Sequence, residues 1–270
     1  IPDVLDLSLH TLEVIEEYVK GGGGLVVEGG RLAEHPEAYG LLGITAGSHY
    51  ISEDLLASYL RFEGEDNSLQ RGGLENTELI ALRGSVTYCK PKEGTKVLMT
   101  LVPPFSPLES VGAPPERASL PVSHSDIPMA ILNECGKGKV VFLPFKLSFM
   151  LNEFRLAEHY MVLSNTVRMV LKDKEMIHTS RHQGLQVTVL KQDKGLIVNF
   201  VNGTGRRPLA TTTPLLDIDV RIGLGPEQKV RNVKQLITGG KIEAREDDGY
   251  LEFLLPRLDV WEAVWIELEN

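Results

Sequence analysis

Hydrophobic residues follow a helical period at the start of the chain. Leu12, Ile15 and Val19 lie three or four positions apart with charged residues between them, and four glycines follow at positions 21–24. This spacing predicts an amphipathic helix that ends at the glycine run. The uninterrupted apolar residues 25–27 then predict a strand that is covered on both faces, as in a parallel sheet.

The pattern up to residue 143 predicts short elements separated by turns. They are a turn-and-helix segment at 31–43, a helix at 52–61 capped by Ser52, a polar surface excursion at 62–76, an antiparallel two-strand insertion at 78–88 and 95–101, an extended proline-rich loop at 103–128, a tight turn at 136–138 and an apolar strand at 139–143. Residues 152–172 hold the longest helical pattern, with apolar residues at helix spacing: Phe154, Leu156, Tyr160, Leu163, Val167 and Val170 or Leu171.

The second part of the chain has a different period. Short alternating runs occur at 185–190, 196–201, 216–224, 230–237, 250–254 and 260–268, separated by Gly, Pro, Asn and Asp. Such a series predicts an antiparallel β-sandwich of roughly seven or eight strands. We therefore expect two domains, at residues 1–174 and 175–270.

Composition and charge narrow the class of protein. With 42% hydrophobic and 24% charged residues the chain has an ordinary globular composition, and no apolar run reaches the ~20 residues of a membrane helix. The net charge of −9 and the lack of a basic cluster argue against nucleic acid as a partner. A soluble protein is expected, with the cytoplasm favoured as its compartment, and neither membrane nor cofactor is predicted.

The beginning of the chain suggests the interior of a longer protein. The sequence starts at Ile1 without methionine or a signal-peptide pattern and enters the first helix almost at once. Because a parallel α/β domain normally opens with a strand, we expect the first strands of the sheet to lie upstream.

Four runs carry a resemblance to a known family. They are YVKGGGGLVV at 18–27, GKGKVVFLPF at 136–145, LIVNFVN at 196–202 and LPRLDVWE at 255–262. Together they resemble the region after the barrel in certain glycoside hydrolases. That region is similar to the trimerisation domain of family 42 β-galactosidases, which has a class I glutamine amidotransferase-like fold, followed by a small β-sandwich.

This resemblance implies a fold and several absences. The fold would be an α/β unit, amidotransferase- or flavodoxin-like with a mostly parallel sheet, plus a C-terminal all-β antiparallel sandwich. The catalytic carboxylates of such enzymes belong to an amino-terminal TIM barrel, a missing partner here, and a homo-oligomer, with a trimer among the candidates, would follow. Amidotransferases carry a Gly-x-Cys-x-Gly nucleophile elbow where this chain has Val27-Glu28-Gly29, so the resemblance implies no glutaminase activity.

Glu28 is the candidate catalytic residue, because ligands and catalytic groups gather at the carboxyl ends of strands in open α/β sheets. As an acid or base it needs a partner, and Glu34 and His35 are near it in sequence. The alternative is a carboxylate that caps the following turn or binds an arginine.

The cysteine and histidine residues are weaker candidates for catalysis or metal binding than Glu28 is. Cys89 and Cys135 are expected to be buried or free thiols, because Cys135 precedes a hairpin turn and not a helix. None of the seven histidines has metal-ligand spacing; His178 and His182 are four apart but lie in a predicted strand and turn. No metal site is therefore predicted. The run of glycines at 21–24 precedes a strand, whereas a phosphate-binding loop follows one.

Two tryptophans are the candidates for carbohydrate binding. Trp261 and Trp265 lie four apart on the last predicted strand, which places them on one face. Indoles there could stack on sugar rings or pack against a neighbouring domain. Asn202 and Thr204 also form a glycosylation sequon, Asn-Gly-Thr.

Three functions remain open. The favoured one is a non-catalytic assembly and accessory region of a multidomain glycoside hydrolase in carbohydrate degradation, which predicts open apolar surface near the chain start. The others are a stand-alone hydrolase that uses Glu28 or a cysteine, and a carbohydrate-binding module that uses the sandwich.

Overall fold

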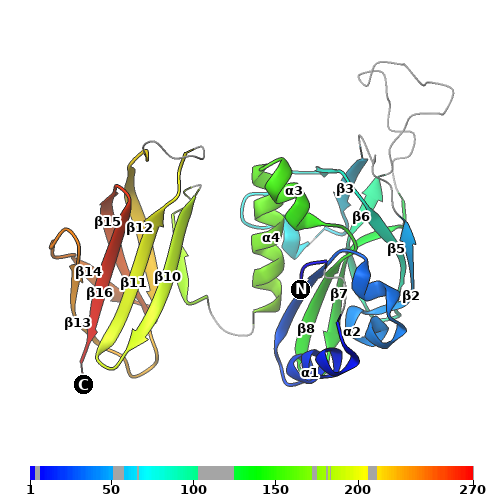
Figure 1. Cartoon of the computed structure of the whole chain (residues 1–270), viewed down its shortest axis with the longest axis horizontal. Helices are drawn as coiled ribbons and strands as arrows, with labels where there is room; N and C mark the ends of the chain where they lie inside the picture. The colour runs from blue at the N-terminus through cyan, green and yellow to red at the C-terminus, as the bar shows by residue number, and fades with distance from the viewer. Residues whose placement is uncertain are drawn as a thin grey trace, which may run out of the picture. The chain divides into compact units, whose positions relative to one another are not determined.

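The protein consists of two compact units. The computed structural model describes residues 1–3, 7–50, 58–65, 67–102, 125–171, 175–180, 182, 184–205 and 212–269. Contacts divide the chain into Ile1–Asp173, called unit 1, and Lys174–Asn270, called unit 2. Helices and a mixed sheet make up unit 1, and the elements of unit 2 are strands (Figure 1). The prediction of an α/β part followed by a β-sandwich is confirmed in outline.

A six-stranded sheet forms the centre of unit 1. Its strand order is β1 (Gly24–Glu28), β8 (Gly138–Leu143), β7 (Pro128–Cys135), β6 (Lys96–Val102), β3 (Ser58–Phe62) and β4 (Leu79–Leu82). The β1 and β8 strands are parallel, and the other four neighbouring pairs are antiparallel. The expectation of a mostly parallel sheet was therefore wrong for the described strands. The turn at Gly136, where φ is +61°, folds β8 back on β7 and makes this pair antiparallel.

Helices cover both faces of this sheet. On one face lie α1 (Leu9–Lys20) and α2 (Tyr39–Leu42), and on the other α3 (Leu147–Glu153) and α4 (Ala157–Val170) (Figure 1). The side chains of β8 point alternately into the two cores. Val140 and Phe142 pack with α1 and α2, and Val141 and Leu143 pack with α3 and α4.

The β1 strand is covered on both faces as predicted, but among the described strands it is the end strand of the sheet. Leu25 and Val27 pack in one core and Val26 against the other, which confirms that the strand is covered on both faces. In the order of the described strands, however, β1 has β8 as its one neighbour. The backbone of Ile1 runs along its other side, where the Glu28 N–H donates to the Ile1 carbonyl at 3.0 Å.

The helix predicted at 52–61 was wrong over the residues that the structure describes. Residues 58–62 form β3, in which Ser58, Leu60 and Phe62 are buried and alternate with less buried neighbours. This period of two is that of a strand, and it outweighs the capping pattern at Ser52. Residues 52–57 lie outside the described part of the chain.

The segment that follows β3 is not a purely polar excursion. Leu69 and Leu74 are fully buried in it, and the Asn67 amide donates to the Glu63 and Leu98 carbonyls at 2.9 and 2.6 Å. The short 3-10 turn η3 (Ser68–Gln70) is thereby held against the main sheet.

The two-strand insertion was also wrong. Residues 78–88 divide between β4 and β5 (Val86–Pro91), and β5 pairs with β2 (Ile44–Tyr50) in a separate two-stranded sheet. The β6 strand does not pair with either of them but lies between β7 and β3, in the middle of the main sheet. Its last five residues are all buried, as is typical of a central strand.

The long helix predicted at 152–172 is two helices. Arg155, with φ of +53°, separates α3 from α4, because a residue in the left-handed region cannot continue an α-helix. Most of the predicted apolar pattern is exposed, at Leu156, Tyr160, Leu163, Val167 and Leu171. Phe154 and Val170, which belong to the same predicted pattern, pack against the core. The buried side of α4 includes three polar residues, His159, Asn165 and Thr166.

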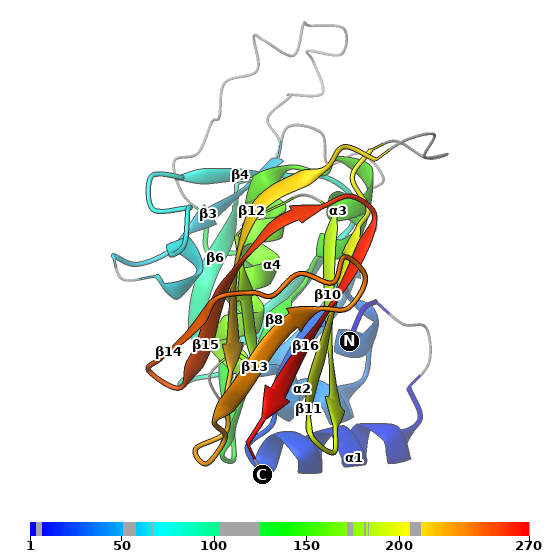
Figure 2. The ribbon, with the colours of Figure 1, turned by 90° about the vertical axis from the view of Figure 1, so that its left-hand side faces the viewer.

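Unit 2 is a sandwich of two four-stranded antiparallel sheets (Figure 2). One sheet has the order β10 (Leu185–Gln192), β11 (Gly195–Asn202), β16 (Trp261–Leu268) and β13 (Val230–Gln235); the other has β14 (Ala244–Asp247), β15 (Tyr250–Leu258), β12 (Leu215–Gly223) and β9 (Ile177–Thr179). The inward residues of both sheets, such as Val198, Phe200, Ile218 and Leu255, form a separate core. Both the eight strands and their antiparallel pairing agree with the alternating pattern.

Candidate functional site

Glu28 lies at the carboxyl end of β1, where the sequence placed it. Its carboxylate accepts hydrogen bonds from the backbone N–H of Ser148, at 2.8 Å, and from the Ser148 hydroxyl. Ser148 is the second residue of α3, so the carboxylate satisfies an N–H group that the helix itself leaves unpaired. A negative charge there also suits the helix dipole.

The partners suggested for Glu28 do not join it. Glu34 ends the short turn η1 (Arg31–Glu34), and its carboxylate approaches Arg31 at 3.9 Å. Within the described residues no hydrogen bond or ion pair connects Glu28 with Glu34 or His35. The geometry of the described residues therefore makes Glu28 a cap of α3.

The turn after Glu28 is filled by protein groups. Gly29 has φ of +82°, and a Cβ there would lie 2.4 Å from Asp3. The Asp3 carboxylate pairs with Lys146 at 2.9 Å and accepts from the Arg31 N–H at 3.0 Å. Burial acts to raise the pKa of Asp3, but Lys146 and Arg31 outweigh it and lower that pKa. The bend after β1 is thus occupied by Asp3 and Gly29.

Neither cysteine has the properties of an activated thiol. Burial raises the pKa of Cys89 to about 12. The pKa of Cys135 is also raised, by burial and by Glu16, against the smaller opposing effects of Lys20 and Lys92. A nucleophilic cysteine needs a lowered pKa, whereas the pKa is raised for both the partly buried Cys89 and the buried Cys135.

The paired histidines have separate contacts. The Nδ1 atom of His178 lies 2.7 Å from a carboxylate oxygen of Glu175, and the ring packs edge-on against Tyr250. His182 contacts the Ser180 hydroxyl at 3.2 Å. Among the described residues no group of three or more potential ligands gathers around a point that could hold a metal ion. None of the described helices has the length and apolar character needed to cross a bilayer.

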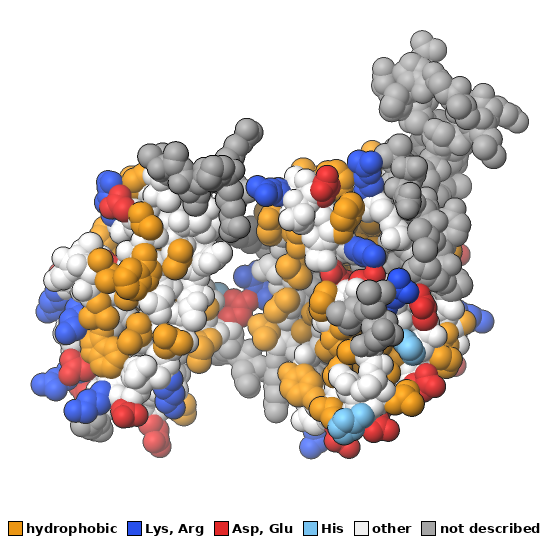
Figure 3. Space-filling view, viewed as in Figure 1, with side chains coloured by type: hydrophobic (Ala, Val, Ile, Leu, Met, Phe, Trp, Pro, Cys, Tyr) orange, Lys and Arg blue, Asp and Glu red, His pale blue; other side chains and the backbone are white. Residues whose placement is uncertain are grey.

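The two tryptophans share the outer face of the first sheet of unit 2. Trp261 is 49% exposed, whereas Trp265 is partly buried. A Cβ on Gly195 would lie 3.0 Å from the Trp265 ring, so this indole lies over the glycine of the neighbouring strand. Figure 3 shows hydrophobic side chains gathered on this face over β11 and β16. Exposed apolar residues on or beside the same sheet are Leu190, Val201, Leu236 and Ile237.

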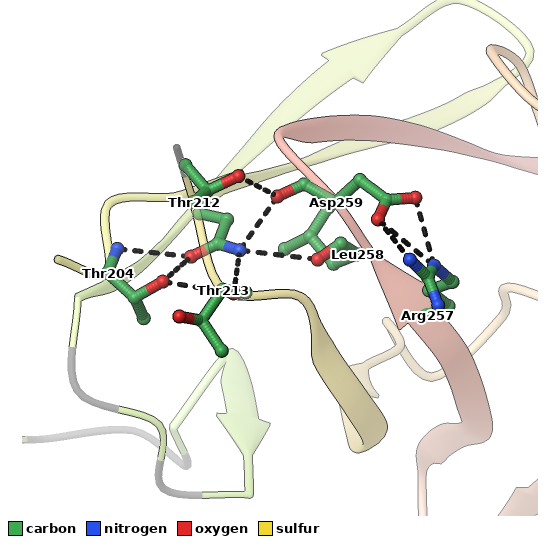
Figure 4. A network of polar contacts seen from close by, with 7 residues as sticks. Thr204, Thr212, Thr213, Arg257, Leu258 and Asp259 are labelled. Carbon is green, nitrogen blue, oxygen red and sulfur yellow. Dashed lines mark hydrogen bonds and ion pairs between the residues drawn. The ribbon is translucent and has the colours of Figure 1, made fainter. Parts of the chain in front are cut away.

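Asn202 of the predicted glycosylation sequon is a structural residue. Its side chain is only 3% exposed, and its amide donates to the carbonyls of Thr213, Leu258 and Asp259 at 2.9, 3.3 and 2.8 Å (Figure 4). Its oxygen accepts from the Thr204 N–H and hydroxyl at 3.0 and 2.6 Å. In the folded sandwich this amide is enclosed by its own hydrogen bonds and joins the end of β11 to two other segments.

A second buried polar group was not predicted from the sequence. Glu262 is 2% exposed, and its carboxylate accepts from the N–H groups of Ile237 and Ala263 and from the hydroxyl of Thr238 at 2.9, 3.0 and 2.7 Å. Gln235 adds a further bond at 3.1 Å. Burial acts to raise the pKa of Glu262, but these hydrogen bonds outweigh it and lower the pKa. The carboxylate is closed to substrate and holds the loop after β13.

One groove on the other sheet of unit 2 contains charged residues. Arg221 and Arg245 both contact Glu252, at 2.7 and 2.6 Å, and the Arg221 guanidinium lies 4.7 Å from the centre of the Tyr250 ring. The hydrogen bond with Arg245 lowers the pKa of Glu252. Because these charges already pair with one another, the groove does not present an arranged set of groups to a ligand.

Comparison with known proteins gives a result for structure alone. No protein-family model matches the chain, and no curated protein sequence matches it. Among solved structures, α-L-fucosidase isoenzyme 2 from Paenibacillus thiaminolyticus matches 100% of this chain and 40% of its own, with a TM-score of 0.75 and 15% identity. The chain has the fold of part of this enzyme.

Two β-galactosidases likewise match nearly all of this chain with a part of their own. Gan42B, a GH42 β-galactosidase from G. stearothermophilus, matches 97% of this chain and 30% of its own, with a TM-score of 0.52 and 16% identity. The β-galactosidase from Bacillus circulans sp. alkalophilus matches 98% and 32%, with a TM-score of 0.51 and 13% identity. The resemblance to glycoside hydrolases is confirmed for the fold, and the chain spans less than half the length of each of these enzymes.

Proposed function

We propose that this chain is a non-catalytic assembly and accessory region of a multidomain glycoside hydrolase. The observation that carries the proposal is exposed apolar surface near the chain start, where Leu9, Val14 and Tyr18 of α1 are 59%, 52% and 59% exposed. Val14 and Tyr18 are one helical turn apart and form an exposed apolar pair, whereas Leu9 lies on another side of α1. Contiguous exposed apolar surface typically marks an interaction site. The fold shared with part of a fucosidase and of two β-galactosidases supplies the context.

The partner proposed for α1 is a catalytic barrel domain. In this proposal unit 1 is an amidotransferase-like scaffold without its nucleophile, residues 1–174 and 175–270 are separate domains, and the whole serves an oligomer such as a trimer. The use of Glu28 as a cap of α3, and the raised pKa values of Cys89 and Cys135, support a role other than catalysis.

Activity measurements on the 270-residue chain test this proposal directly. We expect no turnover of nitrophenyl β-galactoside, nitrophenyl α-fucoside or glutamine. Turnover that Glu28→Gln abolishes would instead establish the stand-alone hydrolase. Loss of turnover in Cys89→Ala or Cys135→Ala would do the same for a thiol.

The apolar surface itself has a separate readout. The dye ANS fluoresces when it binds exposed apolar surface, so the double variant Val14→Glu/Tyr18→Glu is expected to lower the dye signal of the native chain. The matched control, Glu13→Gln/Glu17→Gln, alters the charged side of the same helix and should leave the signal unchanged. Equal ANS fluorescence in all three proteins would remove α1 as the interaction surface.

A second candidate function follows from the exposure of Trp261. Its indole and that of Trp265 lie on one face with the hydrogen-bonding side chains of Asn199 and Lys234 on the adjacent strands, and apolar ring faces flanked by polar groups suit sugar rings. Titration with galactose- and fucose-containing oligosaccharides, followed by tryptophan fluorescence, should then show saturable quenching that Trp261→Ala abolishes. A signal that stays constant up to millimolar sugar would exclude this function.

A further inference from the structure

Asn202 and Gly203 form the single Asn-Gly pair of the sequence. An asparagine in front of glycine is especially prone to lose its side-chain amide, because glycine has no Cβ to hinder the approach of its backbone nitrogen to the asparagine side chain. The reaction requires that the asparagine side chain turns toward that nitrogen and that the glycine N–H is free. Whether Asn202 reacts therefore depends on what the fold does to these two groups.

The folded sandwich holds both groups in hydrogen bonds. The Asn202 amide nitrogen donates to three backbone carbonyls, and its oxygen accepts from the N–H and the hydroxyl of Thr204 (Figure 4). The Gly203 N–H donates to the Gly184 carbonyl at 2.9 Å. With 3% exposure, the Asn202 side chain is also closed to the water that completes the reaction. The native fold therefore blocks the modification that the sequence favours.

We propose that Asn202 is a self-modification site that reacts when unit 2 opens. The Gly203 nitrogen gives its proton to solvent base and attacks Cγ of Asn202, so that a new C–N bond closes a cyclic imide. The bond from Cγ to the amide nitrogen breaks, and this nitrogen takes a proton from water and leaves as ammonia. Water then opens the imide: attack at the side-chain carbonyl gives aspartate, and attack at the backbone carbonyl gives isoaspartate, in which the chain continues through the side chain. Water is consumed and ammonia is released, so the step needs no oxidant, reductant or enzyme.

Neither product fits the native network. Aspartate places an acceptor oxygen where the amide nitrogen of Asn202 meets three carbonyls. Isoaspartate adds a methylene group to the backbone at a residue that pairs with Leu185 and whose N–H donates to the Val260 carbonyl at 2.8 Å. A modified chain therefore loses bonds at the end of β11 when it refolds. An opened unit 2 that reacts before it recloses is thus removed from the native population.

The rate of modification should follow the opened population of unit 2. Because the reaction requires opening, the rate in the native chain is the rate in the unfolded chain multiplied by the unfolded fraction. Folded domains have an unfolded fraction of roughly 10⁻³ or less, so we expect Asn202 to react at least ~1,000-fold more slowly in the native chain than in urea.

Peptide mass spectrometry, after chromatographic separation of the Asn, Asp and isoAsp forms, measures this rate. The 270-residue chain is incubated at mildly alkaline pH with and without concentrated urea. Asp and isoAsp should accumulate at position 202 in urea, and the native chain should keep its asparagine over the same period. Asn199 on the same strand is the internal control, because the bulky Phe200 follows it, and it should stay intact in both samples. Equal rates at position 202 with and without urea, or an Asn202 that stays intact in urea, would overturn the proposal.

Two neighbouring leucines of β15 provide matched variants for the effect of opening. Leu255 is fully buried in the core of unit 2, whereas Leu254 is 45% exposed. Leu255→Ala should raise the unfolded fraction, and with it the rate at Asn202 without urea, by about 30-fold or more. Leu254→Ala should leave this rate within about two-fold of that in the unaltered chain. If Leu255→Ala does not fold, its rate without urea should equal that of the unaltered chain in urea. Rates in both variants that match the native chain would contradict the proposal.

Refolding tests whether the step is one-way. Samples taken from alkaline urea at increasing times are diluted into buffer, and the recovery of native tryptophan fluorescence should fall in step with the loss of Asn202. A matched sample kept in urea at mildly acidic pH spends the same time unfolded but reacts slowly, because the Gly203 nitrogen keeps its proton, and it should refold in full. Full recovery of chains that carry Asp or isoAsp at position 202, or an equal loss of recovery in the acidic sample, would overturn the proposal. None of these measurements involves turnover or the surface of α1, so their outcome is independent of the proposed assembly function.

Discussion

Replacement of Asn202 by aspartate tests the hydrogen-bond network of the sandwich most sharply. The substitution Asn202→Asp keeps the shape of the side chain but exchanges the amide donor for an acceptor oxygen. That oxygen would face the carbonyls of Thr213, Leu258 and Asp259, which the native amide satisfies. With the side chain 3% exposed, water has little access to repair the mismatch.

The expected loss of stability combines two effects. Removing the two N–H donors forfeits about 2 kcal/mol at roughly 1 kcal/mol per hydrogen bond. Burial of an unpaired carboxylate among carbonyl oxygens raises the pKa of the introduced carboxyl, and each unit of pKa adds about 1.4 kcal/mol at neutral pH. We therefore expect a decrease of about 3–5 kcal/mol in the free energy of unfolding at pH 7, which is large for a single substitution.

This loss depends on pH in a defined direction. Because the introduced carboxyl has a higher pKa in the folded than in the unfolded state, ionisation favours unfolding. The destabilisation should therefore be smallest near pH 4, increase as pH rises above the unfolded pKa of about 3.9, and level off above the raised folded pKa.

Tryptophan fluorescence during urea denaturation measures the effect in unit 2 specifically, because both tryptophans of the chain lie in β16. With a denaturant dependence of about 1–1.5 kcal/mol per molar urea, the midpoint should fall by roughly 2–5 M. The control Asn199→Asp alters the outer face of the same strand and should change stability by less than about 0.5 kcal/mol. An unchanged midpoint in Asn202→Asp at pH 7, or a shift that is the same at pH 4 and pH 7, would refute the reasoning.

Three further predictions follow from individual side chains. Glu262→Gln should lower the stability of unit 2 by about 2–4 kcal/mol at pH 7 through loss of charge-assisted hydrogen bonds. Because the pKa of Glu262 is lowered in the folded state, its stabilisation is present above the unfolded pKa of about 4.3 and is lost as pH falls through the folded pKa. Acid denaturation of the two proteins should therefore show their stabilities converging at low pH. Cys89 and Cys135 should resist iodoacetamide at pH 8 in the native chain and react after denaturation, as mass spectrometry of the alkylated protein would show; rapid native labelling would contradict their raised pKa values. Loss of the cap in Glu28→Gln should speed hydrogen exchange at the start of α3, including Ser148, by roughly five-fold for ~1 kcal/mol, and unchanged exchange there would refute the capping role.

The sequence predicted correctly those helices and strands whose local hydrophobic period does not depend on residues far along the chain. The helix before the glycine run, the strand at 139–143 and the short strands of the sandwich have clear periods, and each occurs in the structure. Strand pairing was harder to predict. Whether β6 joins β5 or enters the main sheet depends on which surfaces become buried, and neither the turn at 90–94 nor β-propensity contains that information.

The α4 helix shows why a period alone can mislead. The apolar stripe was visible in the sequence, but its direction depends on hydrogen bonds that His159 and Asn165 make with residues more than 70 positions away. The candidate site posed the same difficulty. The position of Glu28 at a strand end was predictable, whereas its attachment to Ser148 joins segments 120 residues apart.

The parallel pairing of β1 with β8 constrains how unit 1 can form. Leu25 has Val140 as its partner, so an early part of the chain waits for more than a hundred residues before its sheet neighbour exists. Contacts so distant in sequence slow folding and leave apolar strands uncovered meanwhile. During synthesis, α1 and β1 must therefore remain without β8 as a sheet neighbour until the segment around residue 143 has left the ribosome. A chain truncated before that segment would lack this pairing partner altogether.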